Sequence, residues 1–257
     1  DILQKDIKDN RFIRLIRNML KAGYCENWQY HPSYSGTPQG GIISPLLANI
    51  YLDQLDKYVE ESLQPMYTRG KQRRRNKEWI SATNKVSRYR KKGKYDEARK
   101  WDKIRKTLPG QNPYDPDYRR LHYIRYADDF ILTFAGPKEE AMEIKAKLGS
   151  FLQTNLNLEL SQEKTLVTHA LTQRAKFLGY EIHAQHANTK LDRNRVRSVN
   201  GVLALKVPTE VIDNACKKYL KKGKPTHRPE ITADSDYDIV RQYQWHYAGL
   251  VNYYIMA

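Results

Sequence analysis

Residues 121–135 read Leu121-His-Tyr-Ile-Arg-Tyr-Ala-Asp-Asp-Phe-Ile-Leu-Thr-Phe-Ala135. Side chains of different character alternate on both sides of Asp128-Asp129, and this period of two is typical of β-strands. The stretch therefore predicts a β-hairpin that carries two adjacent aspartates at its tip.

The two aspartates are candidates for a metal site. Adjacent carboxylates repel one another unless a cation is present, and Mg²⁺ prefers such hard oxygen ligands. Successive side chains of a strand diverge, so only one of the pair can face a metal squarely, and we expect this to be Asp128. The small side chain of Ala127 would leave room for a bulky substrate. Taken alone, the pair would favour an ordinary turn, because Asp is common in turns. The interpretation as a metal site depends on the motifs around the pair.

The charge of the 257-residue chain is strongly positive. It has 45 Lys and Arg against 29 Asp and Glu, a net charge of +16. This excess points to a polyanionic partner, nucleic acid or an anionic membrane surface. The longest apolar stretch, Gly41 to Leu52, is too short to span a bilayer, so we expect no membrane segment. With only Cys25 and Cys216, the sequence offers no disulfide framework and no Cys-x-x-Cys zinc site.

Outside the hairpin, helical spacing of apolar residues and short β-rich runs predict further elements. Ser44 is expected as an N-cap with Pro45 at the first helical position. The predicted helices cover 11–23, 44–60, 209–222 and 235–256, with one more opening at Pro137, and the predicted short strands cover 158–160, 165–168 and 177–182.

Most of the excess positive charge lies in one block. Residues 66–122 hold 19 Lys and Arg against 6 Asp and Glu, a net charge of +13. The block predicts a basic helical hairpin, 77–90 and 95–107 around Gly93, inserted into one domain. Its cations and interspersed aromatics suit phosphate contact and base stacking. The candidate RNA-binding residues here are Arg73, Arg74, Arg75, Arg90, Lys91 and Lys92.

Four segments resemble the motifs of one enzyme family, in the same order. Tyr126-Ala127-Asp128-Asp129 resembles the catalytic motif of reverse transcriptases. The other three are Pro38-Gln39-Gly40-Gly41-Ile42-Ile43-Ser44-Pro45-Leu46-Leu47-Ala48-Asn49, Ser161-Gln-Glu-Lys164-Thr165 and Lys176-Phe177-Leu178-Gly179-Tyr180. Their residues are most similar to those of bacterial group II intron-encoded reverse transcriptases, also called maturases.

The resemblance implies an α+β fold of the right-hand polymerase type. Such a fold has a palm with an antiparallel sheet packed on helices, a basic helical insertion and the start of a helical thumb. Residues 1–185 would form part of the fingers and the palm, with the insertion at 66–120, and residues 186–257 would form an incomplete thumb, the maturase X region.

The resemblance also implies roles for single residues. Asp128 and Asp129 would bind two Mg²⁺ ions, and Lys164 would lie near the leaving pyrophosphate. The residues implied at template and incoming nucleotide are Gln39, Gly40, Gly41 and Ala127, those at the primer end are Phe177, Leu178 and Gly179, and the thumb lysines on one helix face are Lys217, Lys218, Lys221 and Lys222.

One family feature is missing. The family's palm carries a third metal-binding aspartate upstream of the segment that begins at Asp1, and Asp1, Asp6 and Asp9 do not match its motif. We therefore expect this chain to be catalytically incomplete as written, either a fragment of a longer protein or the partner of another chain. As a fragment, it would still fold and bind nucleic acid.

Two functions stay open at this point. The first is the RNA-directed DNA polymerase of a mobile group II intron, and the second is a maturase that binds intron RNA for splicing, with polymerisation secondary or lost. The partners implied are intron RNA, an RNA template with a DNA primer, deoxynucleoside triphosphates and target DNA, with a homodimer left open. The expected location is the bacterial cytoplasm, in the intron ribonucleoprotein.

Overall fold

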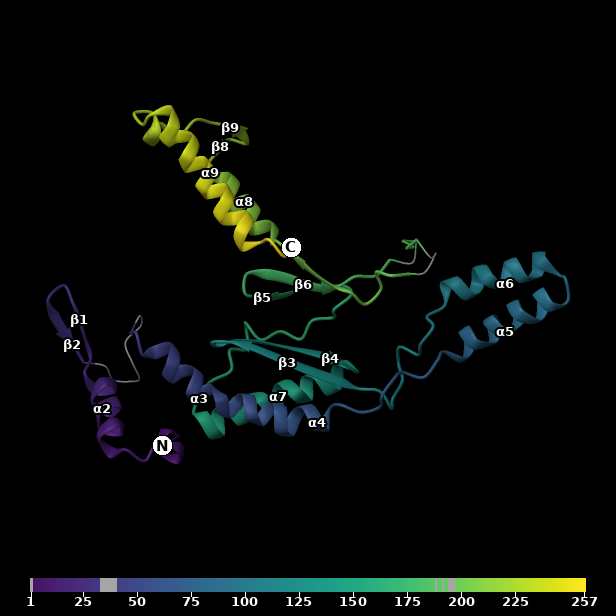
Figure 1. Cartoon of the computed structure of the whole chain (residues 1–257), viewed down its shortest axis with the longest axis horizontal. Coiled ribbons are helices and arrows are strands. Elements are labelled where there is room, and N and C mark those ends of the chain that lie inside the picture. The colour runs from purple at the N-terminus through teal and green to yellow at the C-terminus, as the bar shows by residue number, and fades with distance from the viewer. Residues whose placement is uncertain (1, 33–40, 188, 191, 194–196) are drawn as a thin grey trace. The chain divides into compact units, whose positions relative to one another are not determined.

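The computed structural model describes residues 2–32, 41–187, 189–190, 192–193 and 197–257, which form two compact units (Figure 1). The first unit runs to Arg73 and resumes from Tyr114 to Leu160, and the second comprises Arg74–Pro113 and the chain from Ser161 onward. Both units combine helices with small antiparallel sheets, which agrees with the predicted α+β class.

The first unit is built around two long helices and the β-hairpin. Its elements are α1 (Leu3–Asp6), α2 (Asn10–Lys21), β1 (Tyr24–Glu26), β2 (Gln29–His31), α3 (Ser44–Tyr58), the π-helical turn η1 (Val59–Leu63), α4 (Gln64–Met66), β3 (Arg120–Tyr126), β4 (Asp129–Ala135) and α7 (Lys138–Leu156).

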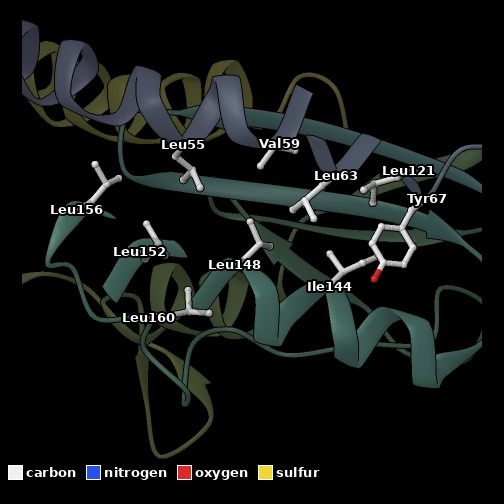
Figure 2. Packing of buried hydrophobic residues seen from close by; sticks show 10 residues of the cluster. All are labelled: Leu55, Val59, Leu63, Tyr67, Leu121, Ile144, Leu148, Leu152, Leu156 and Leu160. Atoms are coloured by element: carbon white, nitrogen blue, oxygen red, sulfur yellow. The ribbon is translucent and has the colours of Figure 1, made fainter. Parts of the chain in front are cut away.

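The core of this unit lies between α7 and the continuous helix formed by α3 and η1 (Figure 2). The helix α7 buries leucines at intervals of four residues, Leu148, Leu152 and Leu156, which is the spacing of one helical face. Leu55 and Val59 face them and are almost completely buried. Burial of each such side chain contributes roughly 1.5–3 kcal/mol, so this interface is the main source of the unit's stability.

The hairpin packs onto this core through alternate residues of its strands. Leu121 is buried, and Tyr123, Phe130, Leu132 and Phe134 pack against the cluster. Because side chains of a strand alternate between two faces, the other face of the two-stranded sheet points away from the core.

Local sequence explains where several helices begin and end. Asp9 caps α2 by accepting hydrogen bonds from the backbone N–H of Arg11, at 2.7 Å, and of Phe12, at 3.4 Å. The predicted opening of α7 at Pro137 is confirmed, and Glu140 lies in its first turn, where negative charge is favoured. Ser44 was expected as the N-cap of α3, but the helix starts at Ser44 and Ile43 takes the cap position without a side-chain hydrogen bond.

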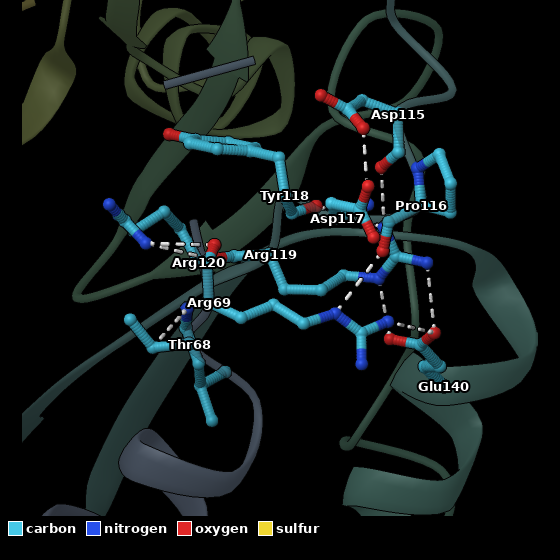
Figure 3. Close-up of polar contacts among 10 residues, drawn as sticks. Thr68, Arg69, Asp115, Pro116, Asp117, Tyr118, Arg119, Arg120 and Glu140 are labelled. Carbon is cyan, nitrogen blue, oxygen red and sulfur yellow. Dashed lines mark hydrogen bonds and ion pairs between the residues drawn. The ribbon is translucent and has the colours of Figure 1, made fainter. Parts of the chain in front are cut away.

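A cluster around Arg119 closes the first unit where the chain leaves for the helical insertion and returns (Figure 3). The Arg119 guanidinium forms a two-pronged ion pair with Glu140, at 2.7 and 3.0 Å, and donates to the backbone oxygen of Asp115 at 2.9 Å. The backbones of Arg69 and Arg119 exchange hydrogen bonds at 3.0 and 3.1 Å. The two segments that lead into and out of the insertion are therefore hydrogen-bonded side by side.

The second unit contains the insertion and the C-terminal part of the chain. Its elements are α5 (Lys77–Lys91), α6 (Tyr95–Thr107), β5 (Ala175–Phe177), β6 (Tyr180–Ala184), β7 (Leu203–Lys206), α8 (Thr209–Lys217), β8 (Leu220–Lys221), β9 (Lys224–Pro225), the 3₁₀ turn η2 (Pro229–Ile231) and α9 (Asp236–Tyr253). The predicted helical hairpin is confirmed, with Gly93 at φ +69° in the turn between α5 and α6.

Several predicted elements were wrong. Residues 158–160 and 165–168 are not strands. Leu160 is instead buried against the helical core of the first unit. The run at 177–182 is split by a turn into the hairpin β5–β6, and the helix predicted over 209–222 ends at Lys217. In the described part of the chain, no helix has both the length and the apolar character needed to cross a bilayer.

Candidate active site

The hairpin β3–β4 presents Asp128 and Asp129 at its tip, as predicted. The strands pair from Arg120 opposite Ala135 to Tyr126 opposite Asp129, which leaves Ala127 and Asp128 as a two-residue turn. Ala127 has φ +54°, a left-handed conformation that costs a residue with a Cβ about 1–2 kcal/mol. Both aspartates are exposed. The turn thus combines an unfavourable backbone conformation with two accessible carboxylates.

The outer face of the hairpin is open and partly apolar. Asp129 is paired with Tyr126, and the pair shares the face that carries Ile124. Tyr126 and Ile124 are 67% and 61% exposed. An accessible aromatic and aliphatic surface therefore extends along the strands from the carboxylates.

The inner face carries Arg125, which connects the turn to α3. Its guanidinium forms a two-pronged ion pair with Asp56, with Nε to Oδ1 at 2.8 Å and Nη2 to Oδ2 at 2.5 Å. Its Nη1 donates to the side-chain oxygen of Asn49 at 2.9 Å and to the backbone oxygen of Ala127 at 2.6 Å. One side chain therefore fixes the carbonyl of the strained turn relative to two residues of the helix.

The electrostatics of this network keep Asp56 charged. The hydrogen bond from Arg125 is the main reason why the pKa of the Asp56 carboxyl lies below its usual value. The Tyr123 hydroxyl donates to Asp56 at 2.8 Å. Burial, together with this hydrogen bond, raises the pKa of Tyr123 well above its usual value, so the hydroxyl keeps its proton as a donor.

The donor set at the tip has the right chemistry for magnesium. Asp128 and Asp129 offer carboxylate oxygens, and Mg²⁺ in phosphoryl-transfer sites is commonly held by one or two carboxylates together with substrate phosphates and water. Within the described ranges, no three His, Cys, Asp or Glu side chains gather into a metal-binding group. The pair is therefore suited to hold magnesium together with a substrate rather than as a closed protein cage.

The glycine-rich motif lies partly outside the described residues, which include neither Gln39 nor Gly40. Gly41 immediately precedes the turn into α3, and its oxygen accepts a hydrogen bond from the Ser44 N–H at 3.0 Å. Asn49, the last residue of the same motif, contacts Arg125. The structure thus links the end of this motif to the aspartate turn through one arginine.

The residues predicted at the primer end form the β5–β6 turn. Phe177 ends β5, and Leu178 and Gly179 form the turn with φ +47° and +75°. The hydroxyls of Tyr253 and Tyr254, at the end of α9, donate to the carbonyls of Leu178 and Gly179 at 3.0 and 3.2 Å. The turn is therefore held against the C-terminal helix, a contact that sequence reasoning did not predict.

The remaining predicted residues are dispersed. Lys164 is exposed in a turn of the second unit, and Arg90 is one of the cations that lower the pKa of Asp102. Arg73 stacks on Tyr118 and Arg75 on Trp79, with guanidinium-to-ring distances of 5.2 and 5.6 Å. Arg74, Lys91 and Lys92 are exposed.

The predicted helix face of thumb lysines was wrong. The helix α8 ends at Lys217, whose Nζ bonds Asn214 at 2.8 Å, and Lys218 is its C-cap. Lys221 belongs to β8, and Lys222 at φ +53° forms the β8–β9 turn with Gly223. The Lys222-Gly223 pair suits a two-residue hairpin turn, and this turn chemistry prevailed over the helical pattern.

Asp56 and Tyr123 were not predicted as parts of the site. The available sign was the position of Arg125, a charged residue in alternation with side chains that pack on the core. A charge on that face requires a partner. Which helix would supply the partner could not be read from the sequence.

Comparisons with known proteins identify the family. The family model described as "Reverse transcriptase (RNA-dependent DNA polymerase)" matches residues 5–182. The "Group II intron-encoded protein LtrA" of Lactococcus lactis subsp. cremoris is 38% identical over 273 residues, which cover 100% of this chain and 45% of the relative. The "Putative COX1/OXI3 intron 1 protein" of Saccharomyces cerevisiae is 32% identical over 272 residues, 99% of this chain and 32% of the relative.

A plant relative is more distant. The "Nuclear intron maturase 2, mitochondrial" of Arabidopsis thaliana is 26% identical over 141 residues, 54% of this chain and 17% of the relative. The chain spans less than half the length of each of these three relatives. The chain belongs to the reverse transcriptase family, with group II intron-encoded proteins among its relatives.

Proposed function

We propose that this chain contributes to the polymerase site of an RNA-directed DNA polymerase encoded by a mobile group II intron. The observation that carries the proposal is the exposed Asp128-Asp129 pair in a strained turn that Arg125 fixes to α3. Carboxylates held on a fixed turn suit metal-assisted nucleotidyl transfer, in which they would bind the metal ions. The similarity to the Lactococcus intron-encoded protein supports the choice of intron type.

Each residue of the site has a role in this proposal. Asp128 and Asp129 would hold two magnesium ions, whose charge would stabilise the phosphoryl group during transfer. Gln39, Gly40, Gly41 and Ala127 would position the base pair formed by template and incoming nucleotide. Lys164 would stabilise charge on the leaving pyrophosphate, and the turn at Phe177, Leu178 and Gly179 would support the primer end.

The proposed ligands follow from this chemistry. They are an RNA template with a DNA primer, deoxynucleoside triphosphates, intron RNA and the target DNA. The basic segment 66–120 and the lysines near α8 would bind phosphates, and the protein would act within the intron ribonucleoprotein in the bacterial cytoplasm. The positive charge of the chain supports these partners.

Primer extension tests the proposal. The protein expressed from the complete reading frame that contains this segment should extend a DNA primer on an RNA template when magnesium is supplied. The change Asp128→Asn should reduce the rate by several powers of ten, because it removes a charge at the metals. Asp117→Asn, which alters an exposed aspartate outside the hairpin, serves as the control. Full activity of the Asp128→Asn protein would contradict the proposal.

The second candidate is a maturase whose task is to bind intron RNA for splicing. The observation that favours it is the similarity to the Arabidopsis protein, which is named as an intron maturase. The two candidates separate in paired assays of the full-length protein. A maturase alone would promote intron splicing without extending any primer, and Asp128→Asn would then leave splicing unchanged.

A further inference from the structure

The two helices of the basic hairpin differ sharply in charge. The segment from Lys77 to Lys94, which comprises α5 and the turn after it, has seven Lys and Arg against one acidic residue, a net charge of +6. The helix α6 has five Lys and Arg against three acidic residues, a net charge of +2. Most of the hairpin's positive charge therefore lies on one side of it.

Ion pairs increase this difference. The carboxylates of α6 pair with cations of their own helix: Asp96 with Arg99 at 3.6 Å, Glu97 with Lys100 at 3.9 Å, and Asp102 with Arg105 at 2.6 Å and Lys106 at 2.9 Å. These four cations already have neighbouring negative charge, so binding phosphate through them would compete with these pairs.

Three cations at the end of α5 have no such partner in the part of the chain that the structure describes. Arg88, Lys91 and Lys92 are exposed and lie at i, i+3 and i+4, so they project from one face of the helix. In the described part of the chain, none of these three side chains is within ion-pair distance of a carboxylate. Their positive charge is fully available to an anion.

An exposed aromatic residue follows these cations closely in the chain. Tyr95, the first residue of α6, follows the turn Gly93-Lys94 and is 64% exposed. The ammonium of Lys85, on α5, lies 3.7 Å from the ring centre of Trp101, on α6. The part of α5 around Lys85 is therefore already in contact with α6. An accessible ring next to free cations suits a ligand that offers both phosphates and bases.

We propose that the face of Arg88, Lys91 and Lys92, continued by Lys94 and Tyr95, is the RNA-binding surface of the hairpin, and that α6 is its structural support. The ligand is single-stranded RNA, bound through its phosphates by the cations and through a stacked base by Tyr95. The inference rests on the proposed function and narrows its RNA-binding segment to one helix face.

Two matched triple variants test the surface. In the first, Arg88, Lys91 and Lys92 are changed to Gln; in the second, Arg99, Lys100 and Lys106 are changed to Gln. Both remove three positive charges from exposed helical positions, and circular dichroism checks that both proteins stay helical. The probe is oligouridylate, and its affinity for the full-length protein is measured from about 50 to 200 mM salt.

The α5 triple variant should bind about 10- to 100-fold more weakly, and the slope of log K against log salt should fall by about two, since each phosphate contact on a single strand contributes roughly 0.7. The α6 triple variant should bind within about threefold of the unchanged protein, with the same slope. Equal losses in both variants would show that only net charge matters and would overturn the inference alone. If the protein without substitutions failed to bind oligouridylate, the RNA-binding part of the proposed function would be overturned as well.

A single substitution tests the nature of the ligand. Tyr95→Ala should weaken the binding of oligouridylate several-fold without changing the salt slope, because stacking releases no counterions. Binding of heparin, a polyanion without bases, should not change. A Tyr95→Ala protein that binds oligouridylate as tightly as before, or that loses both probes equally, would overturn the assignment of this face to RNA.

Discussion

Arg125 occupies a position where one side chain controls the geometry of several others. Its guanidinium contacts Asp56, Asn49 and the backbone oxygen of Ala127. The ion pair with Asp56 holds the guanidinium plane, and the remaining N–H groups fix the turn. Lysine has one point charge and cannot make this set of contacts in one plane.

The variant Arg125→Lys should therefore lower the rate of DNA synthesis by the full-length protein about 10- to 100-fold, because small displacements of a catalytic group have effects of this size. Its affinity for template and primer should change little. The control is Tyr123→Phe, which removes a hydrogen bond to the same Asp56 but leaves the contacts to Asn49 and Ala127 intact. If each variant lost activity in proportion to the decrease in its melting temperature, Arg125 would have only a structural role.

Residue-scale contacts of this kind are the least predictable from sequence. Asp56 and Arg125 are 69 positions apart, and the helical pattern of α3 marks Asp56 only as one polar residue among several. The aspartate pair was predictable because two flanking strands and a two-residue turn are local features. Asn49 lay within a quoted motif, but its contact with Arg125 depends on how α3 packs against the hairpin.

At the scale of elements, capping and turn residues in the local sequence decided which predictions held. The hairpin of α5 and α6 was predicted almost to the residue, because Asn76 caps α5 and Gly93 supplies the turn. The strand predicted at 165–168 failed because no strand among the described residues pairs with it, and a short run of β-formers is not stable alone. The division of 177–182 into two strands required Leu178 to adopt a left-handed conformation, which its residue type disfavours.

The glycines in the two turns provide a test at this scale. Gly179 and Gly93 have similar φ values, +75° and +69°, so alanine costs about 1–2 kcal/mol at either position through the backbone alone. A Cβ at Gly179 would also meet Tyr253 Oη at 3.2 Å, whereas a Cβ at Gly93 would meet nothing within 4 Å. Gly179→Ala should therefore reduce the free energy of unfolding in urea by more than Gly93→Ala. Equal losses would mean that a Cβ at Gly179 is accommodated beside Tyr253 at no additional cost.

At the scale of the whole molecule, internal carboxylates set the response to acid. The pKa of Glu140 is lowered mainly by its hydrogen bond from Arg119, and that of Asp56 mainly by its hydrogen bond from Arg125. Because these values are lower in the folded than in the unfolded state, the stabilisation is complete above the ordinary values near 4 and is lost as pH falls through the lowered ones. Protonation also increases an already large positive net charge, which favours expansion.

Urea unfolding at pH 6 and pH 3 measures this contribution. The unchanged chain should lose free energy of unfolding between the two pH values, and Glu140→Gln, which has no proton to gain at this position, should lose less. Glu139→Gln removes an exposed carboxylate of the same helical turn and should keep the full loss. If Glu140→Gln and the unchanged chain responded identically, the ion pair with Arg119 would not contribute to acid sensitivity.

The hairpin tip could be predicted because it depends on periodicity and turn chemistry along a short stretch, whereas the α+β class followed from the family resemblance. The sequence predicted that the basic block is inserted into one domain, but not that the chain from Ser161 onward belongs to a unit separate from the core of the residues before Arg73 and the segment 114–160. Long-range completion of a core leaves little trace in local sequence. The family resemblance supplied the order of the motifs, but the contacts between them came from packing.

The paired ends of the helical insertion have an evolutionary consequence. The chain leaves and returns through two successive backbone bridges, Arg69 with Arg119 and Arg75 with Gln111. Once these bridges are fixed, the entropy of closing the segment between them changes only slowly with its length. Lineages can therefore lengthen, shorten or exchange the helices beyond the bridges without moving the aspartate turn. The insertion is therefore a part of the chain whose length can change while the aspartate turn keeps its geometry.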